Sequence, residues 1–283
     1  MPLFALALLL AAALLHAGWN VLLKQADERY LTIWLALVAS AVISVPILII
    51  ELPPLHAIWP LALASAVAET TYYLLLARAY RSADFSLVYP IARGAAPALL
   101  ALWAILFLGE MPSSTGLLGL LIIIGGLVIV GSRRMADSAA VPDQQSILLA
   151  LAVAVCISIY SAIDGAAVQI AAAVPYTALI FVLTAAMVTP FVVRHYGLGA
   201  MRHTMRRRLP RAALIGTLSL AAYALVLAAY RLAPVSYAGA VREISVVVGA
   251  LAGRLLFGEP FGMRRTIGAA IIFAGILLIA LAG

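Results

Sequence analysis

The chain has little of what most enzymes and disulfide-bonded domains depend on. Its 283 residues contain one cysteine, Cys156, and four histidines, so neither a disulfide framework nor a thiolate metal site is available. It also lacks a His-Glu-x-x-His helix, a Gly-x-Ser-x-Gly turn and a phosphate-cradling loop. These absences argue against a membrane-embedded enzyme, and we expect no cofactor and no bound metal.

Charged side chains are also scarce, at 10% of the chain, whereas 66% of the residues are hydrophobic and the mean hydropathy is +1.14. This composition lies outside the usage of soluble globular proteins and indicates an integral membrane protein. The N-terminus shows neither the basic stretch nor the small-residue cleavage site of a secretory signal. Residues 3–23 are therefore expected to be a retained membrane span.

Apolar segments of about 20 residues, the length that crosses a bilayer, recur along the chain. They predict ten transmembrane helices, at residues 3–23, 31–50, 57–80, 85–108, 114–131, 146–171, 176–193, 212–230, 235–257 and 265–282. Most of the connections are short and rich in turn residues. Two are longer: a polar linker at 132–145 and an arginine-rich segment at 194–211, which we expect to be a loop.

The second half of the chain repeats the first. Residues 73–126 match residues 223–275, with an aligned Tyr-Arg pair, an aligned Gly-Glu pair and the mates Arg93 and Arg242. Each half holds five predicted helices, and an odd number turns the second half over in the membrane. The expected fold is an all-α integral membrane protein with two five-helix repeats of inverted topology, at residues 1–131 and 146–283. Such repeats are typical of secondary transporters, whose binding site lies at the repeat interface.

Lys and Arg residues are concentrated in the loops of one face. The loops after the first, third, fifth, seventh and ninth helices contain thirteen of them, whereas the loops of the other face contain Arg231 alone. The positive-inside rule therefore places the odd loops in the cytoplasm and both termini outside. We expect the cluster Arg206-Arg207-Arg208 to face anionic lipid rather than nucleic acid.

Polar residues well inside the apolar spans are the candidate binding residues, because a charge there is costly enough that function is the default explanation. His16 and Asn20 share one stripe of the first span, with Trp19 alongside. Five further spans add carboxylates, arginines and aromatic side chains to this set: Glu69, Tyr73, Tyr89, Arg93, Tyr160, Asp164, Tyr223, Tyr237, Arg242 and Glu243.

The charges in this set suggest how a substrate would be held. Arg93 and Arg242, one from each half, would bind a carboxylate or phosphonate through charge-assisted hydrogen bonds. Glu69, Asp164 and Glu243 would face an ammonium group or take up a proton. A structural alternative is that Arg93 with Glu69, or Arg242 with Asp164, forms a buried ion pair that only holds helices together. With both signs of charge present, a zwitterionic metabolite of amino acid type is the preferred cargo.

Two short motifs point to a family. Residues 16–20 read His-Ala-Gly-Trp-Asn and are followed by Lys24, and a Gly-Glu turn follows the fourth span of each half, at Glu110 and Glu259. With the ten-span layout and the duplicated half, they resemble the EamA branch of the drug/metabolite transporter superfamily over essentially the whole chain. The resemblance implies a central cavity lined by helices one, three, four, six, eight and nine, with the fifth and tenth at the rim or at a dimer contact. It also implies cytoplasmic termini, against the charge count.

The expected function is secondary-active transport of a small polar metabolite, as an exporter that works by alternating access, with H+ as a candidate coupling ion. The alternatives are a lipid or lipid-linked sugar flippase and an exporter of organic cations or drugs, because the same fold could serve each. The compact loops fit a bacterial inner membrane. The expected partners are a small-molecule substrate and the lipid bilayer, with no nucleic acid, and the chain would act as a monomer or homodimer.

Overall fold

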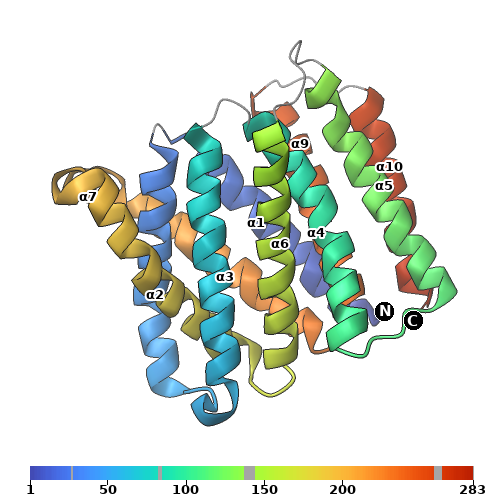
Figure 1. Ribbon diagram of the computed structural model, residues 1–283, viewed down its shortest axis with the longest axis horizontal. Helices are drawn as coiled ribbons and strands as arrows, with labels where there is room; N and C mark the ends of the chain where they lie inside the picture. The colour runs from blue at the N-terminus through green and yellow to red at the C-terminus, as the bar shows by residue number, and fades with distance from the viewer. Residues whose placement is uncertain (27, 82–84, 137–143, 258–262, 283) are drawn as a thin grey trace.

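The computed structural model describes residues 1–26, 28–81, 85–136, 144–257 and 263–282. Within these ranges it leaves the side chains at 24, 77, 79–81, 85–91, 130–136, 146, 249–250, 253–254, 256–257, 263–265 and 282 undescribed. All the regular structure in the described ranges is α-helical (Figure 1). The all-α fold class expected from the sequence is therefore confirmed.

Most helices follow the predicted apolar spans. They are α1 Leu3–Lys24, α2 Arg29–Ile50, α3 Leu55–Arg81, α4 Phe85–Phe107, α5 Ser114–Ala136, α6 Gln144–Ala167, α7 Ala173–Tyr230, α8 Val235–Arg242, α9 Ile244–Phe257 and α10 Met263–Ala282. Lipid offers no partner to an unpaired backbone group, so apolar runs of this length adopt helices. In the described ranges, the segments long and apolar enough to cross a membrane are Leu3–Leu23, Arg29–Ile50, Ile147–Ala167 and Ala173–Tyr230, and Ala92–Phe107, Ser114–Ile129 and Thr266–Leu281 are shorter apolar stretches.

The prediction of a loop at residues 194–211 is wrong, because this segment is helical. Helical structure runs through it, with a kink at Gly197, whose φ of 74° and ψ of 159° lie outside the helical region and are readily adopted by glycine alone. The predicted spans 176–193 and 212–230 correspond to the first and second arms of α7, one on each side of this kink. Arginine is a good helix former, and its stem can follow apolar surface while its charged end reaches water, so a run of arginines need not end a helix.

The predicted span 235–257 is divided at Glu243. α8 ends at Arg242 and α9 begins at Ile244. Hydrogen bonds between residues three apart replace the four-residue spacing of an α-helix there. The Glu243 N–H donates to the Ala240 carbonyl at 3.1 Å, and the Val246 N–H donates to the Glu243 carbonyl at 2.9 Å. A broken helix at membrane depth is tolerated where it is buried in protein or lines a cavity. The break at Glu243 therefore indicates a candidate binding site near the junction of α8 and α9.

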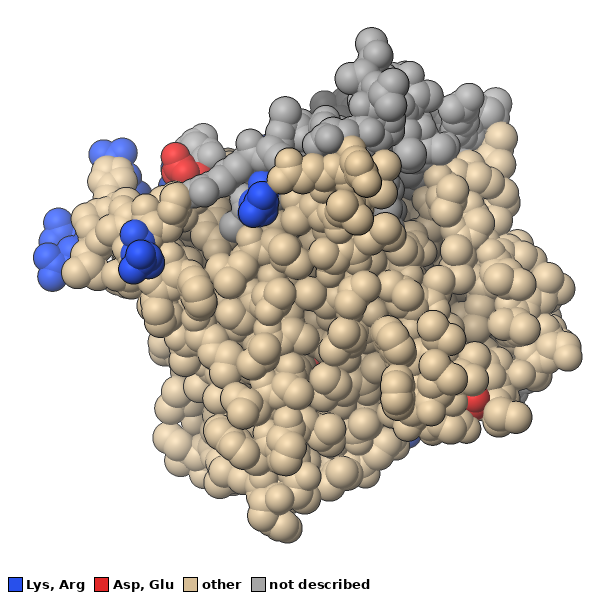
Figure 2. All heavy atoms as spheres, in the orientation of Figure 1, with Lys and Arg blue, Asp and Glu red and all other residues tan. Residues whose placement is uncertain are grey.

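Exposed arginines are concentrated on the part of α7 that was predicted to be a loop. Arg202, Arg206, Arg207 and Arg211 are all exposed there. Figure 2 shows Lys and Arg side chains gathered at the protruding end of the molecule where Figure 1 places α7. The remainder of the visible described surface is almost free of charge, as expected of a surface that meets lipid.

α5 and α10 pack closely against each other at one edge of the bundle (Figure 1). Glycines allow this approach: a Cβ placed on Gly126 of α5 would lie 2.9 Å from the Gly268 carbonyl oxygen of α10, and one on Gly275 would lie 2.8 Å from the Gly119 carbonyl oxygen. Small residues let two helix backbones come together in a membrane. The glycines at this contact thus bring α5 and α10 of one chain together.

The two ends of the chain lie side by side (Figure 1). The ammonium group of Met1 donates to the carbonyl oxygens of Ile279 at 3.5 Å and Ala280 at 3.3 Å, near the end of α10. A positive group at the C-terminal end of a helix is also favoured by the helix dipole. Both termini are therefore on one face of the bundle, which an even number of crossings requires.

The Gly-Glu turn after α4 ties the first half of the chain to the second. The Glu110 carboxylate accepts hydrogen bonds from the backbone N–H groups of Val235 and Ser236, the latter at 3.1 Å, and from the Ser236 hydroxyl. It thereby satisfies donors that the first turn of α8 leaves without helical partners. Gly109 supports the turn with a φ of 68°.

We expect Glu110→Gln to destabilise the protein by about 1–2 kcal/mol, because the helix N-terminus loses an anionic acceptor. Thermal unfolding in detergent measures this as a lower midpoint than that of the wild type. Glu51→Gln, at the exposed end of α2, is the control. Identical midpoints for both variants would show that the Glu110 contacts contribute nothing to stability.

Candidate binding site

A cavity lies between the two halves of the bundle. Its volume is about 150 Å³, which leaves room for on the order of ten water molecules. Its walls come from α1, α2, α3, α4, α6, α8 and both arms of α7. They include the six helices that the family resemblance implies, and α2 and the first arm of α7 are additions. α5 and α10 contribute none of the wall residues in the described part of the chain.

Most of the candidate residues meet at this cavity. Nine of them line it: His16, Trp19, Asn20, Glu69, Tyr73, Arg93, Tyr160, Tyr223 and Arg242. Asp164 and Glu243 are fully buried behind the wall, and each is bonded to wall residues. Tyr237 lies elsewhere, and the side chain of Tyr89 is outside the described residues.

Two arginines and one carboxylate form a charged cluster at the cavity. Arg93 Nη1 donates to Glu243 Oε1 at 3.1 Å, and Arg242 Nε lies 3.5 Å from the same oxygen. Arg242 Nη1 also approaches Ser161 Oγ at 3.3 Å. One carboxylate thus faces two guanidinium groups, one from each half of the chain. The three side chains together carry an excess of positive charge, which favours an anionic ligand.

These pairings differ from both ion pairs considered from the sequence. The carboxylate bonded to Arg93 is Glu243 and not Glu69, and the carboxylate nearest to Arg242 is also Glu243 and not Asp164. Glu243 has no counterpart in the first half of the chain, so the internal repeat could not reveal its role. The buried ion pair exists, but it involves both arginines at once and stands at the cavity wall.

His16 extends the charged cluster on α1. Its Nε2 lies 3.2 Å from Arg93 Nη2. A guanidinium group can only donate, so Nε2 accepts and the imidazole is neutral in this arrangement. One turn further along, Asn20 Nδ2 donates to the His16 carbonyl at 2.7 Å. His16 therefore orients Arg93 without adding charge to the cluster.

The other two carboxyl groups have hydroxyl partners in place of cations. Glu69 Oε2 accepts from Thr184 Oγ1 at 2.9 Å. Asp164 accepts from Tyr176 Oη at 2.7 Å and from the Tyr223 hydroxyl. Within the described ranges, neither carboxylate forms an ion pair with Lys, Arg or His. The site thus has a cationic part around the arginines and an acidic part around Glu69 and Asp164.

Aromatic rings join these two parts along the wall. Tyr73, Tyr72, Tyr160 and Tyr223 contact one another in series, with ring centroids 5.3, 6.2 and 6.3 Å apart. Their edge-to-face packing provides a stiff apolar surface. The buried Trp19 Nε1 has no hydrogen-bond partner among the described residues. The wall therefore offers apolar area for a side group and one N–H for a ligand or a water molecule.

Sequence reasoning missed several polar groups around the cavity, namely Ser161, Tyr176, Thr184 and Tyr230. Hydroxyl side chains are common in membrane helices, so each alone gives no signal in one sequence. Tyr230, whose hydroxyl lies 3.5 Å from Arg242 Nη1, is the exception, since the repeat aligns it with Tyr80. The described residues contain no group of three His, Cys, Asp or Glu side chains that could hold a metal ion.

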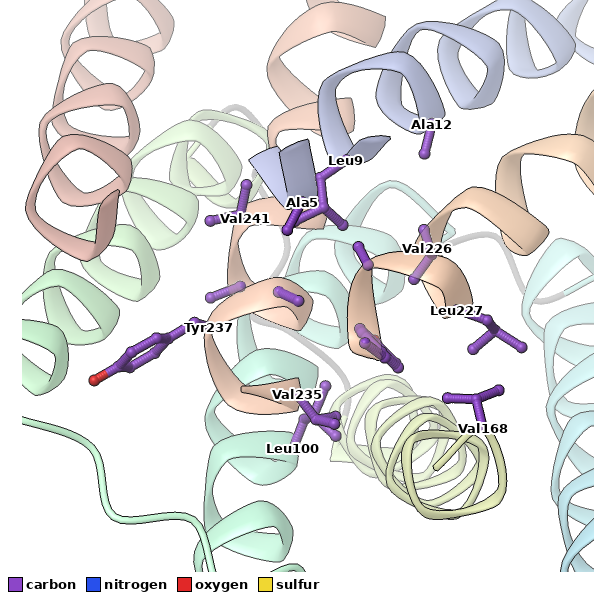
Figure 3. Packing of buried hydrophobic residues seen from close by; sticks show 14 of the residues in the cluster. Ala5, Leu9, Ala12, Leu100, Val168, Val226, Leu227, Val235, Tyr237 and Val241 are labelled. Atoms are coloured by element: carbon purple, nitrogen blue, oxygen red, sulfur yellow. The ribbon is translucent and has the colours of Figure 1, made fainter. Parts of the chain in front are cut away.

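Tyr237 is placed away from the cavity. Its hydroxyl accepts from the Ser113 N–H at 3.0 Å and contacts the backbone position of Gly116 on α5. Figure 3 shows the ring pointing outward from the buried cluster that surrounds Val235 and Val241. Five residues of helix correspond to a rotation of roughly 500°, so Tyr237 is about 140° away from Arg242 around α8. The two side chains therefore face different neighbours.

Comparison with known proteins agrees with this architecture. A model of the EamA-like transporter family matches residues 3–132 and 144–281. Among solved structures 27 chains match, and one, described only as a crystal structure of a protein, superposes with a TM-score of 0.78 at 18% identity, covering 98% of this chain and 97% of the other. That likeness shows the fold alone. No curated protein matches. Because the family matches span nearly the whole chain, this multi-pass membrane protein belongs to the EamA-like transporter family.

Proposed function

We propose that the chain is a secondary-active exporter of a small zwitterionic metabolite of amino acid type, located in a bacterial inner membrane. The observation that carries the proposal is the central cavity, where the two halves bring Arg93 and Arg242 to one part and Glu69 to another. A carboxylate or phosphonate of the substrate binds the two arginines, and its ammonium group faces Glu69. The aromatic wall takes up an apolar side group.

The cationic cluster has capacity for a further anion. Arg242 Nε makes no hydrogen bond within the described residues, although it lies near Glu243. Buried polar atoms are rarely left in this state. A substrate anion would supply acceptors to the guanidinium groups and share them with Glu243. Glu243 Oε1 lies between the two guanidinium groups that such an anion would also contact.

Alternating access follows from the inverted repeat. Arg93 is on α4 of the first half and Arg242 is on α8 of the second, so rocking of the halves about the midplane changes the distance between the two guanidinium groups. Substrate bound to both arginines holds the halves together, and its release lets them separate on the other side. Glu243 contacts both arginines and so links the two halves at this point.

Counterflow in proteoliposomes tests the proposal. Vesicles that contain the protein are given a mixture of radiolabelled amino acids, phosphonates, organic cations and lipid-linked sugars, and the accumulated compounds are identified. We expect a zwitterion to accumulate. Accumulation of organic cations alone would favour a drug exporter, and movement of lipid-linked sugars alone would favour a flippase; either outcome contradicts the proposed cargo.

Tyr237→Phe is expected to leave the rate of counterflow unchanged and to lower stability by about 1 kcal/mol, because only the Ser113 N–H loses its acceptor. Tyr223→Phe is the comparison, since its hydroxyl bonds Asp164 at the cavity wall. Counterflow rate and thermal unfolding are measured on the same preparations. If the Tyr237→Phe protein is fully folded but has a slower counterflow rate, Tyr237 takes part in substrate binding and the prediction is wrong.

A further inference from the structure

Asp164 is a buried acid that stands behind the cavity and not in it. Its exposed fraction is 0%, and it is absent from the residues that line the cavity. One carboxylate oxygen accepts from Tyr176 Oη and the other from the Tyr223 hydroxyl. The Tyr223 ring is itself part of the cavity wall. A single hydrogen bond thus connects the buried acid with the space where substrate would bind.

Titratable groups surround Asp164 on several helices. Those that interact with it, through charge or hydrogen bonds, are Glu69 on α3, Tyr176, Tyr223 and Tyr230 on α7, and Arg242 on α8. α4 also packs on α6, and its Arg93 acts on Tyr160 of α6. Arg242 directs its contacts to Ser161 and Glu243, so no cation in the described ranges is bonded to Asp164. Glu69 is a second carboxyl group in electrostatic contact with Asp164, and two carboxylates so placed repel each other.

The Ser65 hydroxyl is a buried polar group beside Asp164 that lacks a hydrogen-bond partner among the described residues. The Ser65 hydroxyl, 0% exposed, lies beside Asp164 and Tyr176. It makes no hydrogen bond of regular geometry to any described residue. A protonated carboxyl group has an O–H that needs an acceptor, and the Ser65 oxygen is available for it. The surroundings of Asp164 can therefore accommodate its acid form as well as its anion.

We propose that Asp164 is the proton-binding residue of the transporter, separate from the substrate cavity, and that Tyr223 links its protonation to the cavity. The term transporter here rests on the proposed function. A proton from cavity water passes through the Tyr223 hydroxyl to Asp164, while Tyr223 gives up its own proton in the same step and remains neutral. The new O–H of Asp164 turns to Ser65, and Tyr223 loses a charge-assisted hydrogen bond and can turn toward the cavity. Proton release runs the same route in reverse.

Glu69 has the complementary role. It lines the cavity and is 8% exposed, so it can meet an ammonium group directly. Two nearby carboxylates repel, and the ionisation of one depends on the state of the other. An ammonium group at Glu69 offsets this repulsion and favours loss of the proton from Asp164. Substrate binding and proton release are then coupled, which is the exchange required of an exporter driven by protons.

Infrared difference spectroscopy tests the site without any substrate. The full chain, reconstituted in lipid, is compared at alkaline and acidic pH, and the C=O stretching band of protonated carboxyl groups is followed. We expect one component of this band to be missing in Asp164→Asn and to return at a shifted frequency in Asp164→Glu. A spectrum of folded Asp164→Asn identical to that of the wild type would overturn the proposal.

A transport assay tests the coupling, with a radiolabelled amino-acid mixture as the probe. The ratio of uptake with and without a proton gradient is expected to be on the order of tenfold for wild type at a difference of one pH unit. It should approach unity in Asp164→Asn and fall in Tyr223→Phe, whereas Glu69→Gln should raise KM and still respond to the gradient. A full response in Asp164→Asn, or a response lost only in Glu69→Gln, contradicts the assignment.

The two assays separate the proton site from the proposed function. If the Asp164 component of the infrared band is present but no amino acid is transported, the cargo is wrong and the proton site stands. If amino acids are transported and neither the band nor the gradient response depends on Asp164, the cargo stands and the proton site is wrong. Should Asp164→Asn fail to fold, Asp164→Glu in the infrared assay and Tyr223→Phe in the transport assay decide the question.

Discussion

Replacing Arg93 with alanine is expected to abolish accumulation of the zwitterion in proteoliposomes. The variant loses the cation that α4 contributes to the cavity and leaves Glu243 with Arg242 alone. Truncating one partner of a buried charge pair costs about 2–5 kcal/mol, which corresponds to a loss of roughly 30-fold to several thousandfold in affinity. Counterflow rates at several substrate concentrations, normalised to the amount of folded protein, measure the effect.

A double variant separates binding from charge balance. Arg93→Gln combined with Glu243→Gln removes the cation and its carboxylate partner together, so no unpaired carboxylate remains at that position. If Arg93 only neutralises Glu243, the double variant transports as well as the wild type. If Arg93 holds the substrate anion, the double variant folds normally and stays inactive. The proposed binding role requires the second result.

Gly126→Val is expected to destabilise the protein by about 1–3 kcal/mol or more, because it overpacks the contact between α5 and α10. A Cβ at this position would lie 2.7 Å from Ile272 Cγ1, 2.9 Å from the Gly268 carbonyl oxygen and 3.0 Å from the Ile272 nitrogen. Two of these three neighbours are backbone atoms, which cannot turn aside as a side chain can. The helices must therefore separate along their length.

The neighbouring glycine provides a matched control. A Cβ on Gly125 would have nothing within 4 Å, so Gly125→Val changes the same helix by the same chemistry without the clash. The fraction of protein that stays monodisperse in detergent after heating compares the two variants. Equal heat resistance would contradict close packing of α5 against α10, whereas a lower value for Gly126→Val alone supports it.

The helices that could be predicted are those whose apolar runs are uninterrupted. α1 and α2 follow directly from segments that have no charged residue in their interior, because such a segment can satisfy its backbone in lipid only as a helix. The segment 194–211 was mispredicted, since polarity was taken as a sign of a loop. Polarity indicates contact with water, and a helix at the membrane surface also has that contact.

The candidate site was predictable to the extent that charge in an apolar span is rare. Arg93, Arg242 and Glu69 were selected for that reason, and the structure brings all three to one cavity. Their partners could not be predicted: Glu243 lies 150 residues from Arg93 in the chain, and Thr184 lies 115 residues from Glu69. Tyr237 was also selected from the sequence, but its position on α8 turns the ring away from the cavity.

The sequence by itself determined that this is a duplicated α-helical membrane protein, since span length, hydropathy and internal repetition are local or linear properties of the chain. It also determined that a few charges must be buried among apolar helices. Only the tertiary structure decided how those charges are divided, with Glu243 between two arginines and Asp164 held by two tyrosines. The physical reason is that hydrogen bonds and ion pairs act over a few ångströms, and which side chains come so close depends on how the helices rotate and pack.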